Sequence, residues 1–188
     1  MAYGVVNAAR VAAQNLDVYN RTAQATVDVA GGGLVALAHS GVRGNDVYTA
    51  TVPVTGGLTG LWMALNPGQK TIADVNGNVY NGLSRDPRAY TNLANSPFGA
   101  IKVHKDDFIE ITSDGVVSTD VASVVAGDYL NAVNAKTILG RTAAASGIPA
   151  STTTFVVNYV GYATFPPVKG SVGMTQQKVF GLTCVQEW

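Results

Sequence analysis

The sequence predicts a mainly β fold, either a β-sandwich or a β-barrel, and three observations support this prediction. Several short segments alternate apolar and polar residues with the period of two that is typical of strands. Turn-forming residues separate these segments, and the chain of 188 residues contains 21 glycines. Hydrophobic residues make up 47 % of the chain and charged residues only 13 %, which favours a buried core over disorder.

The length suits one domain that buries roughly 70 % of its unfolded surface. We divide the chain into an N-terminal arm, residues 1–22, and a single β-rich domain, residues 23–188. The arm is rich in alanine, and its thin apolar stripe leaves a helical and an extended conformation equally open. We expect it to lie on a partner, so that deletion of residues 2–20 would leave the thermal unfolding of the domain nearly unchanged.

The first predicted strand, residues 23–29, alternates small apolar residues with polar ones. Gly31-Gly32-Gly33 follows it and lacks the Lys-Ser/Thr of a phosphate-binding loop, so we interpret these glycines as a turn. Further strands are predicted at 34–37, 47–53, 60–65, 100–103, 107–112, 116–118, 137–140, 153–160 and 178–185. Short strands at regular spacing are typical of a sandwich or a barrel.

Residues 66–100 differ in composition, because Asn, Gly, Asp and Pro crowd together there. A connection of this length inside a domain is usually functional, so we expect a long ordered loop excursion that makes a contact. Asp86 followed by Pro87 is a good N-cap and first-turn pair. This pair predicts one or two helical turns over 87–94.

The segment 118–134 has two interpretations. Its valines fit one face of a helix that Thr119 or Asp120 would cap. Equally, Gly127-Asp128 fits a turn that leads one strand into another at 129–133. We favour the hairpin.

Potential metal ligands are scattered along the chain. His39 and His104 have no His or Cys close by in the sequence, so we interpret them as solvated or capping histidines. On a strand, Asp106 and Glu110 share one face while Asp107 points to the other. We interpret these three acids as a turn followed by a solvent-facing strand.

The segment 74–78 begins like a calcium-binding EF-hand loop. The pattern then fails, because Val79 stands where the loop needs Gly and Arg85 where it needs Glu. An Asn-Gly turn is the better interpretation. We therefore expect no metal and no cofactor.

Catalytic signatures are equally missing from the sequence. There is no Gly-x-Ser-x-Gly motif and no Cys–His pair at a suggestive spacing, so we expect that the protein is not an enzyme. Cys184 lies in an apolar segment and is expected to be a small buried strand residue. Twelve Lys and Arg balance twelve Asp and Glu and are spread along the chain, which argues against a nucleic-acid partner. No secretory signal or membrane-length apolar run occurs, so we expect no membrane contact.

Three segments carry a resemblance to a known class of proteins. They are Gly60-Leu61-Trp62-Met63-Ala64-Leu65-Asn66-Pro67, Asp86-Pro87-Arg88-Ala89-Tyr90-Thr91-Asn92 and Asp106-Asp107-Phe108-Ile109-Glu110-Ile111-Thr112. Together they resemble small head structural proteins of tailed bacteriophages, of the capsid decoration or cement kind. The resemblance implies a β-barrel or sandwich on the outer capsid surface that bridges and stabilises major capsid subunits. It also implies synthesis in the host bacterial cytoplasm, localisation in the virion, and partners that are the major capsid protein and copies of the chain itself in a homo-oligomer.

Under this hypothesis, residues 1–22, the 66–100 excursion and the C-terminal segment make the intersubunit contacts. The candidate interface residues are Tyr3, Val5, Val6, Asp86, Arg88, Tyr90 and Trp188. One alternative is another virion component, such as a tail or head-fibre subunit. A second alternative is a β-sandwich that binds carbohydrate or a host surface, with Trp62 or an exposed Tyr as the stacking platform.

Overall fold

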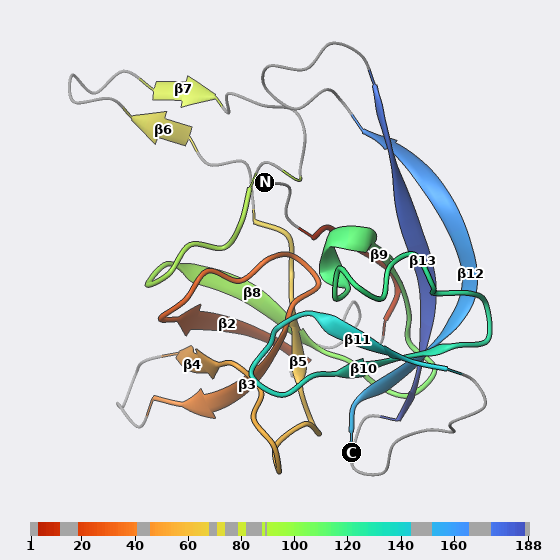
Figure 1. The fold of residues 1–188 in the computed structure, drawn as a ribbon. Coiled ribbons are helices and arrows are strands. Elements are labelled where there is room, and N and C mark those ends of the chain that lie inside the picture. The colour runs from red at the N-terminus through yellow and green to blue at the C-terminus, as the bar shows by residue number, and fades with distance from the viewer. Residues whose placement is uncertain are drawn as a thin grey trace.

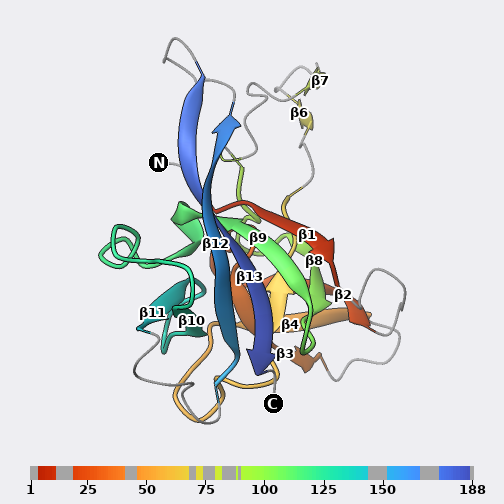
Figure 2. The ribbon, with the colours of Figure 1, turned by 90° about the vertical axis from the view of Figure 1, so that its right-hand side faces the viewer.

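The computed structural model describes residues 4–11, 19–40, 46–67, 71–73, 79–81, 88, 90–143, 152–165 and 174–186. Two β-layers make up this part of the chain (Figures 1 and 2): a closed five-stranded barrel and a six-stranded sheet that packs against it. The predicted mainly β fold is therefore confirmed, with a barrel and a sheet combined in one structure.

The barrel closes in the order β2-β4-β3-β5-β8 and back to β2. Its strands are β2 (Asn20–Ala25), β3 (Leu34–His39), β4 (Val47–Thr51), β5 (Trp62–Ala64) and β8 (Pro97–Lys102). The β2–β4 pair is parallel, and the other pairs are antiparallel.

The six-stranded sheet has the order β1-β9-β13-β12-β10-β11 and is antiparallel throughout. Its strands are β1 (Val6–Arg10), β9 (Phe108–Thr112), β10 (Tyr129–Ala132), β11 (Leu139–Thr142), β12 (Thr154–Phe165) and β13 (Thr175–Gln186). The last two strands, each of twelve residues, form a hairpin that curves along one side of the molecule (Figure 1). A short ribbon of β6 (Thr71–Ala73) and β7 (Val79–Asn81) stands apart from both layers.

The main core lies between the barrel and the sheet. The barrel contributes outward-facing side chains such as Leu34, Met63 and Ile101, and the sheet contributes Phe155 and Phe180 among others. Full burial of large side chains of this kind stabilises the fold by about 1.5–3 kcal/mol each.

A second, smaller core fills the inside of the barrel. Most of its members are alanine or valine: Ala23, Ala25, Val29, Val35, Ala50, Ala64, Phe98 and Ala100. A barrel of only five strands has a narrow lumen, so small side chains fit there where larger ones would not. The alternation of alanine with polar residues in β2 is thus the sequence signal of a lumen-facing strand.

The N-terminal segment is extended where it is described, which decides between the two conformations that the sequence left open. Its residues 6–10 are β1, an edge strand of the sheet, and Val6 is 4 % exposed in the main core. Residues 20–22 already belong to β2. Deletion of residues 2–20 would remove β1 and its core contacts, so the expectation that thermal unfolding would be nearly unchanged is wrong.

Two local predictions within the domain need correction. Over 90–94, Asn92 forms an antiparallel bridge with Val29, so the helical turns predicted over 87–94 do not extend into this part. The predicted strand at 129–133 exists as β10, but turns occupy 118–123 and the hairpin partner of β10 is β11. The prediction that Gly127-Asp128 precedes a strand is thus correct, whereas the predicted pairing of that strand with the segment before the turn is wrong.

Other local predictions are confirmed. Cys184 is fully buried on β13. Gly32 has a positive φ of 79° in the predicted glycine turn, and a side chain there would press on Ile111. His39 is exposed, as expected, whereas the half-buried ring of His104 stacks on Tyr19 with 4.2 Å between the ring centroids.

Candidate functional site on the outer face of the sheet

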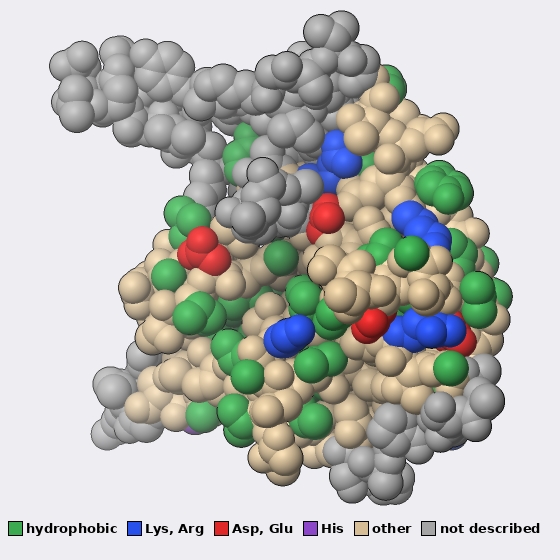
Figure 3. All heavy atoms as spheres, viewed as in Figure 1, with side chains coloured by type: hydrophobic (Ala, Val, Ile, Leu, Met, Phe, Trp, Pro, Cys, Tyr) green, Lys and Arg blue, Asp and Glu red, His purple; other side chains and the backbone are tan. Residues whose placement is uncertain are grey.

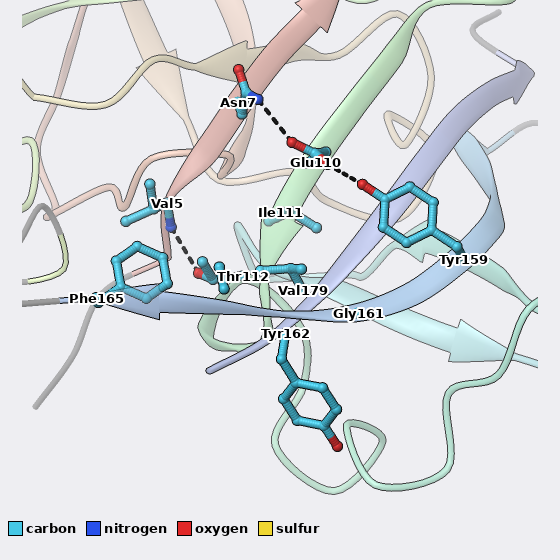
Figure 4. Close-up of a pocket in the computed structure, with 11 residues that line it drawn as sticks. Val5, Asn7, Glu110, Ile111, Thr112, Tyr159, Gly161, Tyr162, Phe165 and Val179 are labelled. Atoms are coloured by element: carbon cyan, nitrogen blue, oxygen red, sulfur yellow. Dashed lines mark hydrogen bonds between the residues drawn. The ribbon is translucent and has the colours of Figure 1, made fainter. Parts of the chain in front are cut away.

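A groove of about 370 Å³ lies on the face of the six-stranded sheet that is turned away from the barrel (Figure 4). We call it the outer-sheet groove. It is lined by Val5, Asn7, Glu110, Ile111, Thr112, Tyr159, Gly161, Tyr162, Ala163, Phe165 and Val179. These residues come from β1, β9, β12 and β13 and from the segment that leads into β1.

One lateral row of residues crosses four strands at the centre of this groove. In register, Asn7 on β1 lies beside Glu110 on β9, then Gly181 on β13, then Tyr159 on β12. The Asn7 Nδ2 donates a 2.8 Å hydrogen bond to Glu110 Oε2, and the Tyr159 hydroxyl donates to Glu110 Oε1 (Figure 4). Gly181 makes this possible because the Tyr159 ring crosses the space that a side chain at 181 would occupy.

The carboxylate of Glu110 governs the electrostatics of this row. Its hydrogen bond with the hydroxyl, together with burial and its own negative charge, raises the pKa of Tyr159 to about 12. Tyr159 is therefore a neutral donor at physiological pH. Both Glu110 oxygens accept hydrogen bonds from side chains of the row, so the carboxylate links Asn7 of β1 to Tyr159 of β12.

Hydrogen bonds on both sides of the chain fix the position of the first residues of β1 in the sheet. The Val5 N–H donates to Thr112 Oγ1 at 3.0 Å, and the Val5 carbonyl accepts from the Thr112 N–H at 3.0 Å. On the free edge of β1, the Asn66 side chain accepts from the Val6 N–H at 2.9 Å and donates to the Val6 carbonyl at 2.6 Å. Asn66 thus pairs with the edge as another strand would.

Arg88, from the excursion, packs on Phe165, one of the residues that line the groove. Arg88 is 3 % exposed, its Nη1 donates to Gln177 Oε1 at 3.0 Å, and its Cζ lies 4.5 Å from the centre of the Phe165 ring. It holds the excursion against the β12–β13 hairpin of its own chain.

The candidate interface residues are distributed unevenly. Val5 is half-buried at the groove, whereas Val6 and Arg88 are buried inside the chain. Tyr90 is half-buried within the excursion. Tyr3, Asp86 and Trp188 lie outside the described residues, as does the 74–78 segment. Of the four candidates that the structure describes, it brings Val5 to the groove.

Sequence reasoning did not single out Asn7, Tyr159 or Phe165 as site residues. The available signal is the alternate spacing of Tyr159, Gly161, Ala163 and Phe165, which places them on one face of a strand. Phe108 on the next row is also on this face, with its ring centre 6.4 Å from that of Tyr159.

The described residues contain no group of three or more His, Cys, Asp or Glu side chains that could hold a metal ion. Asp107 has a local structural role, since its Oδ2 accepts from the His104 N–H at 2.7 Å. Acidic and basic side chains are few and intermingled on the face shown in Figure 3, where uncharged atoms cover most of the described surface.

No family model, curated protein sequence or solved structure matches this chain. In the described part of the chain, no helix has the length and apolar character needed to cross a membrane.

Proposed function

We propose that the chain is a structural virion protein that binds the outer surface of a phage capsid and stabilises it by bridging major capsid subunits. The observation that carries this proposal is the outer-sheet groove, a preformed surface whose central polar groups bond to one another. Surfaces of this kind contribute binding area, because their polar groups are already satisfied and their shape is held by the sheet. The resemblance of three segments to head structural proteins supplies the kind of partner.

The dimensions of the sheet fit such a role. Six strands about 4.8 Å apart span roughly 24 Å from the first strand to the last, and a standard interface buries roughly 800 Å² on each partner. A partner would therefore have to cover most of the sheet face. A repeating shell would then multiply the modest affinity of each copy.

The proposal is tested by co-sedimentation of the purified chain with mature and immature capsid shells from its source. We expect saturable binding to mature shells, at a fixed ratio to the capsid protein, and a gain in the heat resistance of the shells. Failure to bind either shell would overturn the capsid role and direct attention to tail assembly.

Point variants locate the contact better than a deletion of the arm, because β1 belongs to the sheet. Val5 lines the outer-sheet groove, is half-buried and makes its hydrogen bonds with Thr112 through its backbone, so Val5→Ser should weaken shell binding without unfolding the domain. Val54, on the loop after β4, is 60 % exposed and does not line the groove, and Val54→Ser is the matched control. Equal binding by both variants would place the contact on another face.

Carbohydrate binding is the second candidate function. The pair of Phe108 and the 38 % exposed Tyr159 on one sheet face favours it, since sugar rings stack on exposed aromatic faces. A glycan-array screen with the parent chain and the variant Tyr159→Ala tests this role. A hit that the variant loses would support saccharide binding over capsid binding.

A further inference from the structure

One side of the β12–β13 hairpin is an open strand edge. β12 pairs with β13 on one side, whereas on the other side β10 covers residues 154–156. Val157 then bonds Gly127 and Asp128 through its backbone, at 2.8 Å in each case. Among the described residues, no strand and no backbone group bonds that side of β12 over 159–165. We call residues 159–165 the β12 edge, and Figure 1 shows this part of the hairpin at the outer margin of the molecule.

The two outermost strands of the same sheet are covered. The Asn66 side chain bonds the backbone of β1. On β11, the Arg141 N–H donates to Asp120 Oδ2 at 2.9 Å, and the Leu139 carbonyl accepts from the Val117 N–H at 2.8 Å. Proteins cover such edges because unpaired N–H and C=O groups are a template for another strand. The β12 edge is therefore the place where this sheet can accept a strand.

The composition of the β12 edge favours pairing. Its sequence, Tyr-Val-Gly-Tyr-Ala-Thr-Phe, has no charged residue and no proline, the residues that usually blunt an exposed edge. Its register with β13 runs without a shift, so no bulge bends it away. Alternate residues direct both backbone groups to the open side. Tyr162 is 70 % exposed, and Figure 4 shows its side chain pointing to the opposite side of β12 from that of Tyr159.

The side chains of this edge complement those of a second copy in antiparallel pairing. When a twofold axis passes through Tyr162, this residue lies opposite its own copy. In the same register, Tyr159 of one copy lies opposite Phe165 of the other, and Val160 lies opposite Thr164. Aromatic pairs and pairs of β-branched residues stabilise neighbouring strands, and no like charges are brought together. The occupant that this edge fits is thus the same edge of another copy.

We propose that the β12 edge pairs with the β12 edge of a second copy of this chain, antiparallel and about a twofold axis at Tyr162. The two six-stranded sheets then form one continuous sheet. Such a contact uses the same surface on both copies, so it closes at a dimer. Because the axis is perpendicular to the sheet, both outer-sheet grooves lie on one face of the dimer. The inference does not rest on the capsid role, since it concerns the free chain.

Analytical ultracentrifugation of the full chain tests the pairing. We expect the parent to show a reversible equilibrium between monomer and dimer. Tyr162→Lys and Tyr162→Glu each bring two like charges together at the axis, so each should weaken dimerisation about tenfold or more. An equimolar mixture of the two variants should restore the dimer, because a lysine then faces a glutamate. Failure of the mixture to restore it would overturn the register.

The matched control is Val54→Lys, which adds the same charge at a 60 % exposed position outside the six-stranded sheet. It should dimerise within about twofold of the parent. Equal weakening by Val54→Lys and Tyr162→Lys would mean a net-charge effect and would overturn the site. A parent that stays monomeric up to about 1 mM would also overturn self-pairing and leave the edge to an extended segment of a partner protein.

Amide hydrogen exchange shows whether the contact is a strand pair. A rise in protein concentration should slow exchange at alternate residues of the β12 edge, because the residues between them already bond β13. A dimer without this slowing would have its contact elsewhere, which contradicts the proposal. A parent that dimerises in this way but fails to co-sediment with shells would leave the β12 edge standing and reject only the capsid role.

Discussion

The ring of Tyr159 occupies the place of a side chain at Gly181 on the neighbouring strand. A Cβ built on Gly181 would overlap the Tyr159 ring, whereas a Cβ on Gly161 would lie 3.6 Å from it, an ordinary contact. The two glycines share the same sheet face and the same aromatic neighbour, so they form a matched pair for substitution.

Gly181→Ala should therefore destabilise the fold by about 1–3 kcal/mol, because the ring must leave its position and its bond to Glu110. Gly161→Ala should change stability by less than about 0.5 kcal/mol. Urea unfolding followed by fluorescence measures both. A double variant with Tyr159→Ala should recover much of the loss at position 181, and no recovery would show that the strain lies elsewhere.

The Tyr159–Glu110 pair also predicts a pH dependence. The pKa of Tyr159 in the folded protein is about 12, above the value of about 10 for an unfolded tyrosine. A raised pKa means that the fold favours the protonated phenol, so its stabilising effect is fully present below about pH 10 and is lost as the pH rises towards 12.

Titration of phenolate absorbance should show one tyrosine of the parent that ionises late. Glu110→Gln removes the charge and weakens the hydrogen bond, so this tyrosine should then ionise closer to about pH 10. The melting temperature of the parent should also fall more steeply above about pH 10 than that of the variant. Identical titration curves for the two proteins would contradict the pairing.

The lumen of the barrel predicts an asymmetry between two neighbouring positions of β4. Ala50 is 3 % exposed inside the barrel, while Thr49 is exposed on its outside. Ala50→Leu should cost about 1–3 kcal/mol or more, because a five-stranded lumen has no room for extra methylenes. Thr49→Leu should stay within about 0.5 kcal/mol, and thermal unfolding compares the two. A tolerated Ala50→Leu would mean that the lumen is not closed.

Most strands of the domain could be predicted from the sequence, but which of them close into a barrel could not. Alternation of Ala23 and Ala25 with polar neighbours is a local signal and was sufficient to predict a strand. Closure depends on the parallel pairing of β2 with β4 and on β8 returning to β2, and neither leaves a local pattern. In the sequence these alanines indicate only small side chains, and the strand pairing is what places them in one lumen.

The candidate site was beyond local reasoning for the same reason. Asn7 and Glu110 are 103 residues apart in the chain, and Glu110 and Tyr159 are 49 apart. Their hydrogen bonds exist because β9 lies between β1 and β13. In the same way Arg21, Trp62 and Lys102 are spread along the chain, so the contacts of both cations with the Trp62 ring required the fold.

Asn66 provides the last test, since its side chain substitutes for a strand at the edge of β1. It makes two hydrogen bonds with the backbone of Val6, and Val6 is buried in the main core. Asn66→Ala leaves that N–H and carbonyl without these bonds and should cost about 1–3 kcal/mol. Asn134, whose Oδ1 accepts from the Thr55 N–H at 2.9 Å, is exposed, so Asn134→Ala should cost less than about 1 kcal/mol.

Amide hydrogen exchange gives the sharper readout of the Asn66 variant. The loss should concentrate in β1, with faster exchange at Val6 and its neighbours, while the lumen residues of the barrel keep their protection. Such a local effect follows because β1 pairs with β9 on one side, while on its other side the Asn66 side chain bonds the backbone of Val6. Uniformly faster exchange across both layers would instead mean that the β1 edge and the barrel unfold as one cooperative unit.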